Sequence, residues 1–120
     1  MNEIEKMYEN CGIKPELHTF PGRDWDDEGL ASWYEEKIYP PFTAEKQFEL
    51  IKLLGNVRDY TVEIDKFKGV YYVGCRSAGS NDKLWGSSNT FEDAVAELIN
   101  ETWFCLTEEE KEQVKGILEA

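Results

Sequence analysis

Residues 90–102 read TFEDAVAELINET and carry the clearest helical pattern of the 120-residue chain. Six of their side chains recur at intervals of three and four residues, which places them on one face of a helix. They are Phe91, Ala94, Val95, Leu98, Ile99 and Thr102. Thr90 and Asp93 have the spacing of a capping box, in which side chains satisfy the free amides of the first turn. The pattern predicts a helix over 91–103 that packs across one face of a sheet.

The sheet is predicted directly before this helix. Tyr60, Val62 and Ile64 alternate with polar residues, as in a strand that has one face in water. Residues 70–76 are rich in aromatic and β-branched side chains, and a third, short strand is expected over residues 83–87 after a turn. Because the connections are short, we expect an antiparallel meander.

A second capping signal follows the helix. Residues 107–110 read TEEE, which places carboxylates in a first turn, where the helix dipole stabilises them. Val114, Ile117 and Leu118 then supply an apolar face. These features predict a short closing helix over residues 108–118.

Two helices are expected near the beginning of the chain. Residues 2–11 have apolar side chains at helical spacing and end at Gly12, a residue suited to the left-handed position after a helix. Thr43 is a good N-cap for a helix over residues 44–54. In that helix Phe48, Ile51 and Leu54 are expected to line one face.

The segment between these helices is harder to assign. Residues 12–24 contain two prolines and two glycines, which favour turns and extended backbone. Residues 26–38 could form a short helix with Leu30, Trp33 and Tyr34 on one side, ended by the two prolines that follow Tyr39.

These elements predict a fold of the α+β class. We expect one domain over residues 1–120, in which helices pack on a three-stranded antiparallel sheet. Residues 1–58 are expected to be helical, residues 59–87 to form the β-meander, and residues 90–118 to form two further helices after the sheet. A chain of this length can bury roughly two-thirds of its unfolded surface around one core.

The net charge of −12 is distributed unevenly. It amounts to −5 over residues 1–58, zero over residues 59–86 and −7 over residues 87–120. A surface with this excess of carboxylates repels nucleic acid and membranes and attracts basic protein surfaces. Protein binding is therefore expected rather than direct binding of nucleic acid.

No motif indicates a cofactor, a metal or a reaction. Cys11, Cys75, Cys105 and the single histidine, His18, lack the close spacing of zinc ligands, so Cys11 and Cys75 are interpreted as small buried hydrophobes. One histidine offers few ways to activate a nucleophile. We therefore expect no catalytic residues, and a small enzyme is the least favoured of three alternatives.

The location expected from the sequence is the cytoplasm. No stretch approaches the roughly 20 apolar residues of a membrane span, and residues 1–20 lack the basic and apolar regions of a signal peptide. Three cysteines at wide spacing fit a reducing compartment better than a disulfide framework.

Two segments carry a resemblance to known proteins. Residues 39–51 read YPPFTAEKQFELI, and residues 90–94 and 106–111 read TFEDA and LTEEEK. These segments resemble parts of small, mostly uncharacterised proteins of bacteriophages and prophages of Gram-positive bacteria. The resemblance implies a phage origin and the cytoplasm of a host cell, but no activity.

The first candidate binding site is a cluster of carboxylates around an aromatic residue. It consists of Asp24, Trp25, Asp26, Asp27 and Glu28, with Trp33 shortly after. The indole of Trp25 could fill a pocket of a partner while the carboxylates meet Arg or Lys at its rim. The alternative is a solvated helix start with the indole in the core.

The second candidate site is the polar face of the helix expected over 91–103. This face carries Glu92, Asp93, Glu97 and Glu101, about one turn apart. Such a row could imitate spaced phosphates and occupy a nucleic-acid channel of another protein. The alternative is the ordinary wet side of an amphipathic helix.

The favoured hypothesis is a phage protein that binds and inhibits a basic, nucleic-acid-handling host protein. A CRISPR effector nuclease is the sharpest example, because it holds nucleic acid in a positively charged channel. The first alternative is a phage structural or assembly factor that docks through exposed aromatic residues.

Overall fold

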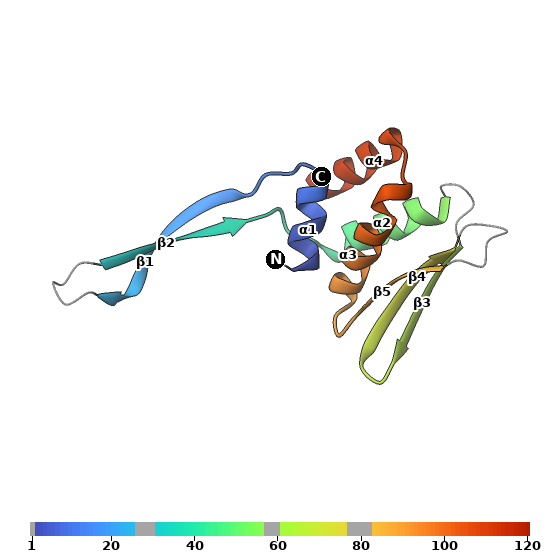
Figure 1. Ribbon diagram of the computed structural model, residues 1–120, viewed down its shortest axis with the longest axis horizontal. Coiled ribbons are helices and arrows are strands. Elements are labelled where there is room, and N and C mark those ends of the chain that lie inside the picture. Colours follow the sequence, from blue (N-terminus) through green and yellow to red (C-terminus); the bar gives the residue numbers. More distant parts are fainter. Residues whose placement is uncertain (1, 26–30, 57–60, 77–82) are drawn as a thin grey trace.

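The computed structural model describes residues 2–25, 31–56, 61–76 and 83–120 (Figure 1). Its elements in chain order are α1 (Glu3–Asn10), β1 (Glu16–Trp25), β2 (Ala31–Ile38), α2 (Ala44–Asn56), β3 (Thr61–Phe67), β4 (Val70–Arg76), β5 (Lys83–Ser88), α3 (Phe91–Thr102), the 3₁₀ turn η1 (Trp103–Cys105) and α4 (Glu108–Glu119). The α+β class is confirmed.

The three-stranded antiparallel meander is confirmed, in the order β3-β4-β5. Strands β3 and β4 are joined at Lys68 and Gly69, whose φ angles of 50° and 80° suit a two-residue hairpin turn. Ile64 pairs with Val73, and Val73 pairs with Gly86, so these three positions share the face of the sheet that meets the helices.

Helix α3 lies across this face as predicted. Val95, Leu98 and Ile99 are buried in the core, and α3 contacts both β4 and β5. The approach to β5 is close because position 86 is glycine. A Cβ atom there would overlap the carbonyl oxygen of Ala94 and lie 2.7 Å from the amide nitrogen of Leu98.

The Gly86→Ala substitution is expected to lower the free energy of unfolding by about 1–3 kcal/mol, because the added methyl group meets helix backbone that cannot rotate away. Gly74→Ala is the matched control. A Cβ at Gly74 would meet only the ring of Trp85, at 2.6 Å, and that side chain is exposed enough to move. Denaturant unfolding of both variants measures the difference. Equal losses of unfolding free energy in the two variants would show that the packing of α3 on β5 does not require glycine at position 86.

The expected helix caps are present at both closing helices. The Thr90 hydroxyl accepts a hydrogen bond from the Asp93 amide at 3.3 Å. Thr107 and Glu110 form a complete capping box, with bonds of 3.2 and 2.9 Å. Each bond satisfies an amide that the first turn leaves without a helical partner.

Helix α1 joins the core through α3. Its Met7 and Tyr8 are fully buried, and Gly12 ends the helix with a φ of 73°. The side chain of Asn100 donates to the carbonyl oxygen of Glu3 at 2.9 Å and to its carboxylate at 2.8 Å. The two helices, far apart in sequence, are thereby fixed side by side.

The expected helix over 26–38 is wrong where the structure describes it. Residues 31–38 form β2, which pairs antiparallel with β1 from Glu16 opposite Ile38 to Trp25 opposite Ala31. The spacing of Leu30, Trp33 and Tyr34 in the sequence suited a helix, but aromatic residues also favour strands, and pairing with β1 decides the outcome. Residues 16–38 are therefore an exception to the expected helical character of 1–58.

The expected face of α2 is wrong at one position. Leu54 is fully buried and Ile51 is partly buried, but Phe48 is 55% exposed. The helix turns Leu50 into the core instead, and Phe48 lies at the margin with its ring 6.0 Å from that of Phe91. The helix itself was predicted, ending at Asn56 rather than residue 54.

Two cysteines occupy the core as expected. Cys11 and Cys75 are buried free thiols. Burial raises the pKa of the Cys11 thiol to about 12, and burial raises that of Cys75 to about 11. Both side chains therefore stay neutral near pH 7 and act as small apolar groups.

Candidate functional site: an acidic arm, an acidic helix and a groove

Strands β1 and β2 form an arm that projects from the helices (Figure 1). The two strands pair with each other and not with the three-stranded sheet. The radius of gyration is 17.8 Å, against about 14 Å for a compact chain of this length. The longest dimension of 67 Å reflects the arm.

The local sequence permits such a ribbon. Pro21 cannot donate to a neighbouring strand, but in a two-stranded ribbon each strand has a free edge where this is tolerated. The register between β1 and β2 shifts between Pro21 and Trp25, a stretch that includes Gly22. The prolines and glycines that made helix improbable here thus fit an irregular hairpin.

The arm carries much of the negative charge of the protein. Residues 16–38 contain seven carboxylates against one Arg and one Lys, a net charge of −5. This equals the whole excess of residues 1–58. Helix α1 carries a net charge of −2 and α2 is neutral, and Lys14 and Arg58 offset the charge of α1. Near the base of the arm, His18 Nε2 lies 3.2 Å from the Glu16 carboxylate, and Glu35 and Glu36 are exposed.

Three residues of the first predicted binding cluster lie on the described part of this arm. Asp24 and Trp25 close β1, and Trp33 lies in β2 opposite Pro21. Asp26, Asp27 and Glu28 lie outside the described residues, between the ends of the two strands. The described members of the cluster therefore lie on the part of the arm farthest from the helices (Figure 1).

The second predicted cluster, on α3, is divided by the structure. Glu92 and Glu101 are exposed, whereas Asp93 and Glu97 are partly buried. The Asp93 carboxylate accepts a hydrogen bond of 2.6 Å from the Thr90 hydroxyl, so it belongs to the helix cap. Three carboxylates remain on this face for a partner. The two predicted clusters lie on different parts of the molecule, and the fold does not join them into one site (Figure 1).

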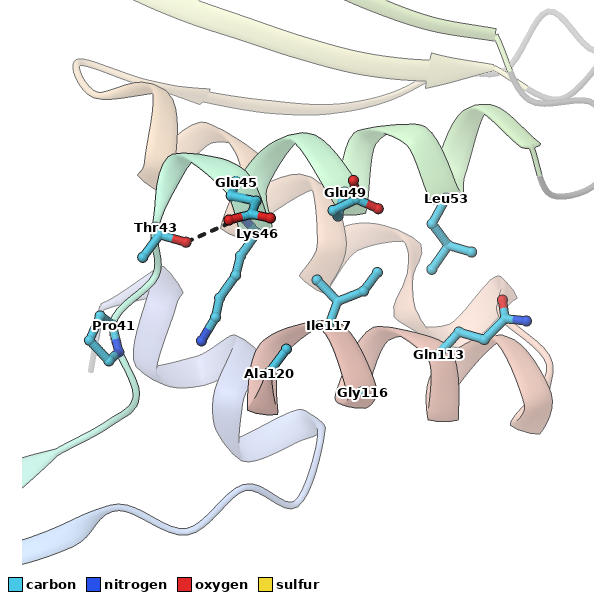
Figure 2. A pocket seen from close by; sticks show the side chains of 10 residues that line it. All are labelled: Pro41, Thr43, Glu45, Lys46, Glu49, Leu53, Gln113, Gly116, Ile117 and Ala120. Atoms are coloured by element: carbon cyan, nitrogen blue, oxygen red, sulfur yellow. Dashed lines mark hydrogen bonds between the residues drawn. The ribbon is translucent and has the colours of Figure 1, made fainter.

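A groove that sequence analysis missed lies between α2 and α4 (Figure 2). It has a volume of about 980 Å³, and its apolar lining comprises Pro41, Leu53, Gly116, Ile117 and Ala120. The helices run antiparallel, with Thr43 near Ala120 and Leu53 near Gln113 (Figure 2). No local sequence signal marks this groove, because the residues of its two walls are at least 60 positions apart in the chain.

Lys46 fixes one end of the groove. Its ammonium group donates to the carbonyl oxygen of Leu118 at 2.9 Å, and the residue is only 9% exposed. A lysine in this position satisfies one of the last carbonyls of α4 and stabilises the negative end of the helix dipole. The bond therefore holds α2 and α4 together.

The outer face of the three-stranded sheet exposes aromatic side chains. Phe67 is 61% exposed and Trp85 is 41% exposed. Tyr72 meets the Trp85 ring edge-on, with the centroids 6.5 Å apart. This face is the best candidate for a contact that depends on aromatic rings instead of charge.

Across residues 2–25, 31–56, 61–76 and 83–120, no three His, Cys, Asp or Glu side chains are grouped so that they could hold a metal ion. Among the helices described, none is long and apolar enough to cross a membrane.

The chain was compared with known protein families, curated proteins and solved structures. The chain matches no protein-family model, no curated protein and no solved structure.

Proposed function

We propose that this chain is a phage protein that binds a basic, nucleic-acid-handling host protein through its acidic arm and thereby inhibits it. The observation that carries the proposal is the arm: a hairpin that projects from the body and has a net charge of −5. A strand of ten residues extends roughly 30 Å, enough to reach into a channel while the helices remain outside it.

The charge on such an arm acts mainly on association. Carboxylates on a projecting hairpin meet a basic surface before the body of the molecule does. This electrostatic steering raises the association rate constant well above that of a neutral pair. An effector nuclease with a positively charged channel for nucleic acid is an example of such a partner. Occupation of the channel would exclude the nucleic acid.

A second candidate function is that of a phage assembly factor. The exposed Phe67 and Trp85 on the outer face of the sheet favour it, because aromatic side chains are enriched at contacts between proteins. Binding through this face would depend little on salt, whereas binding through the arm would weaken steeply as salt is raised.

Charge reversal separates these functions. A variant with Asp26→Lys, Asp27→Lys and Glu28→Lys is expected to associate with the partner about 10–1000 times more slowly than the wild type, because the steering field is reversed. Its melting temperature is expected to stay near that of the wild type and is measured alongside. The partner is first captured from host lysate and eluted by raising salt, and association is then measured by surface plasmon resonance.

The matched control reverses three carboxylates on α3: Glu92, Glu97 and Glu101. Asp93 is left in place because it caps the helix. The control variant is expected to associate at nearly the wild-type rate. If the two triple variants are slowed equally, net charge and not the arm controls binding. If neither is slowed, the assembly-factor function is favoured instead.

A further inference from the structure

The groove between α2 and α4 has an open apolar floor. Gly116 lies within the 12-residue helix α4, and a Cβ atom added to it would meet nothing within 4 Å. Glycine is a poor helix former, and its packing within this chain does not require it. Because Gly116 has no side chain, there is open space above the helix backbone at this position. Ile117 and Ala120, one turn further on, flank this space (Figure 2).

The rims of the groove are acidic. Glu45 and Glu49 line it from α2, one turn apart. On α4, the exposed Glu109 and Glu112 lie one turn before Gln113 and Gly116 and so extend the same helix face. Carboxylates thus border the apolar floor on both sides.

The cations of α2 do not neutralise these rims. The Lys46 ammonium is bonded to the Leu118 carbonyl and nearly buried. Lys52 is exposed and lies 3.5 Å from the Glu49 carboxylate, so it partly compensates one of the four acids. On α4, Lys111 lies 3.5 Å from Glu108 and Lys115 lies 4.0 Å from Glu119, and neither lysine lines the groove. The four acids of the rims are therefore in excess over the cations near them.

We propose that this groove binds an amphipathic helix of a partner protein, with an apolar stripe on the floor and Lys or Arg side chains against the rims. The volume of about 980 Å³ lies at the upper end of the range for ligand clefts. The stretch from Thr43 to Leu53 spans about 15 Å of helix, which matches two to three turns of a partner helix. Apolar anchors at helical spacing are how grooves of this kind recognise helices. The site is separate from the arm and does not depend on the arm's function.

The probe is a fluorescein-labelled synthetic peptide of about 15 residues, with leucine at every third or fourth position and lysine elsewhere. A second peptide has the same residues in an order that forms no apolar stripe, and a third has glutamate in place of lysine. Fluorescence anisotropy with the full chain is expected to give at least about tenfold tighter binding for the first peptide than for either control.

Substitution of Gly116 tests the location of the site. Gly116→Leu places a side chain in the open space and is expected to weaken binding of the first peptide at least about tenfold without lowering the melting temperature. Gly116→Ala is the matched control, which adds one methyl group and should change affinity less than about threefold. A variant with Glu45→Gln and Glu49→Gln tests the rims if the leucine variant does not fold, and it too should bind more weakly.

Three results would overturn the proposal. The first is equal binding of the ordered and reordered lysine peptides, and the second is unchanged binding to both the Gly116→Leu and the Glu→Gln variants. The third is a wild-type protein that sediments as a dimer and becomes a monomer on Gly116→Leu, since a second copy of the chain would then occupy the groove.

Discussion

The Leu98→Ala substitution is expected to lower the free energy of unfolding by about 2–5 kcal/mol. Leu98 is fully buried near the centre of α3, the helix that contacts both the sheet and α1. Removing its isobutyl group loses both the transfer free energy of the buried atoms and the packing around the cavity that remains. Because the side chains around Leu98 pack against it, the loss of unfolding free energy should be well above that of a surface substitution.

Denaturant unfolding followed by circular dichroism measures this loss, and Glu101→Ala on the exposed face of the same helix is the control. Glu101→Ala should change stability by less than about 0.5 kcal/mol. A loss below about 1 kcal/mol for Leu98→Ala would contradict the packing of α3 on the sheet, which holds the rest of the fold in place.

Much of the fold could be predicted because local signals and packing agree. At α3, the cap at Thr90, the spacing of the apolar residues and burial against β5 all favour the same helix. The same holds for the capping box at Thr107 and for the turn at Lys68 and Gly69, whose positive φ angles suit a tight hairpin. Agreement among levels is what makes an element recognisable from sequence.

The arm could not be predicted because its local signals conflict. The spacing of Leu30, Trp33 and Tyr34 suits one face of a helix, and only the pairing of residues 31–38 with β1 reveals a strand. Phe48 was placed in the core for a related reason: helical spacing identifies an apolar face but not which edge of that face meets the sheet. Its exposure follows from how α2 sits beside α3, a tertiary feature.

The candidate sites differ in how far sequence could identify them. The acidic cluster at residues 24–28 is visible as composition, but the sequence does not show that Asp24 and Trp25 end a strand of a projecting hairpin. No sequence pattern predicts the groove, because Gly116 of α4 and Leu53 of α2 line it together only in the folded protein. The charge of a segment can be counted from the sequence, whereas a groove can be recognised only in the folded structure.

Removal of the outer arm should abolish partner binding and leave the body intact. Thr19 lies opposite Glu35 in the hairpin, so residues 20–34 can be replaced by Asn-Gly, a dipeptide that closes two-residue hairpins. The removed segment includes the whole acidic cluster and both Trp25 and Trp33. Because β1 and β2 pair only with each other among the described strands, the change should alter the free energy of unfolding by less than about 1 kcal/mol.

The most direct test is capture of the basic host partner from lysate by the wild-type protein and by this shortened variant, side by side and at the same salt concentration. The groove between α2 and α4 and the outer face of the sheet are unchanged in the variant, so they serve as internal controls. If the acidic arm binds the partner, the wild type captures the partner and the folded shortened variant does not. Undiminished capture by the shortened variant would contradict it.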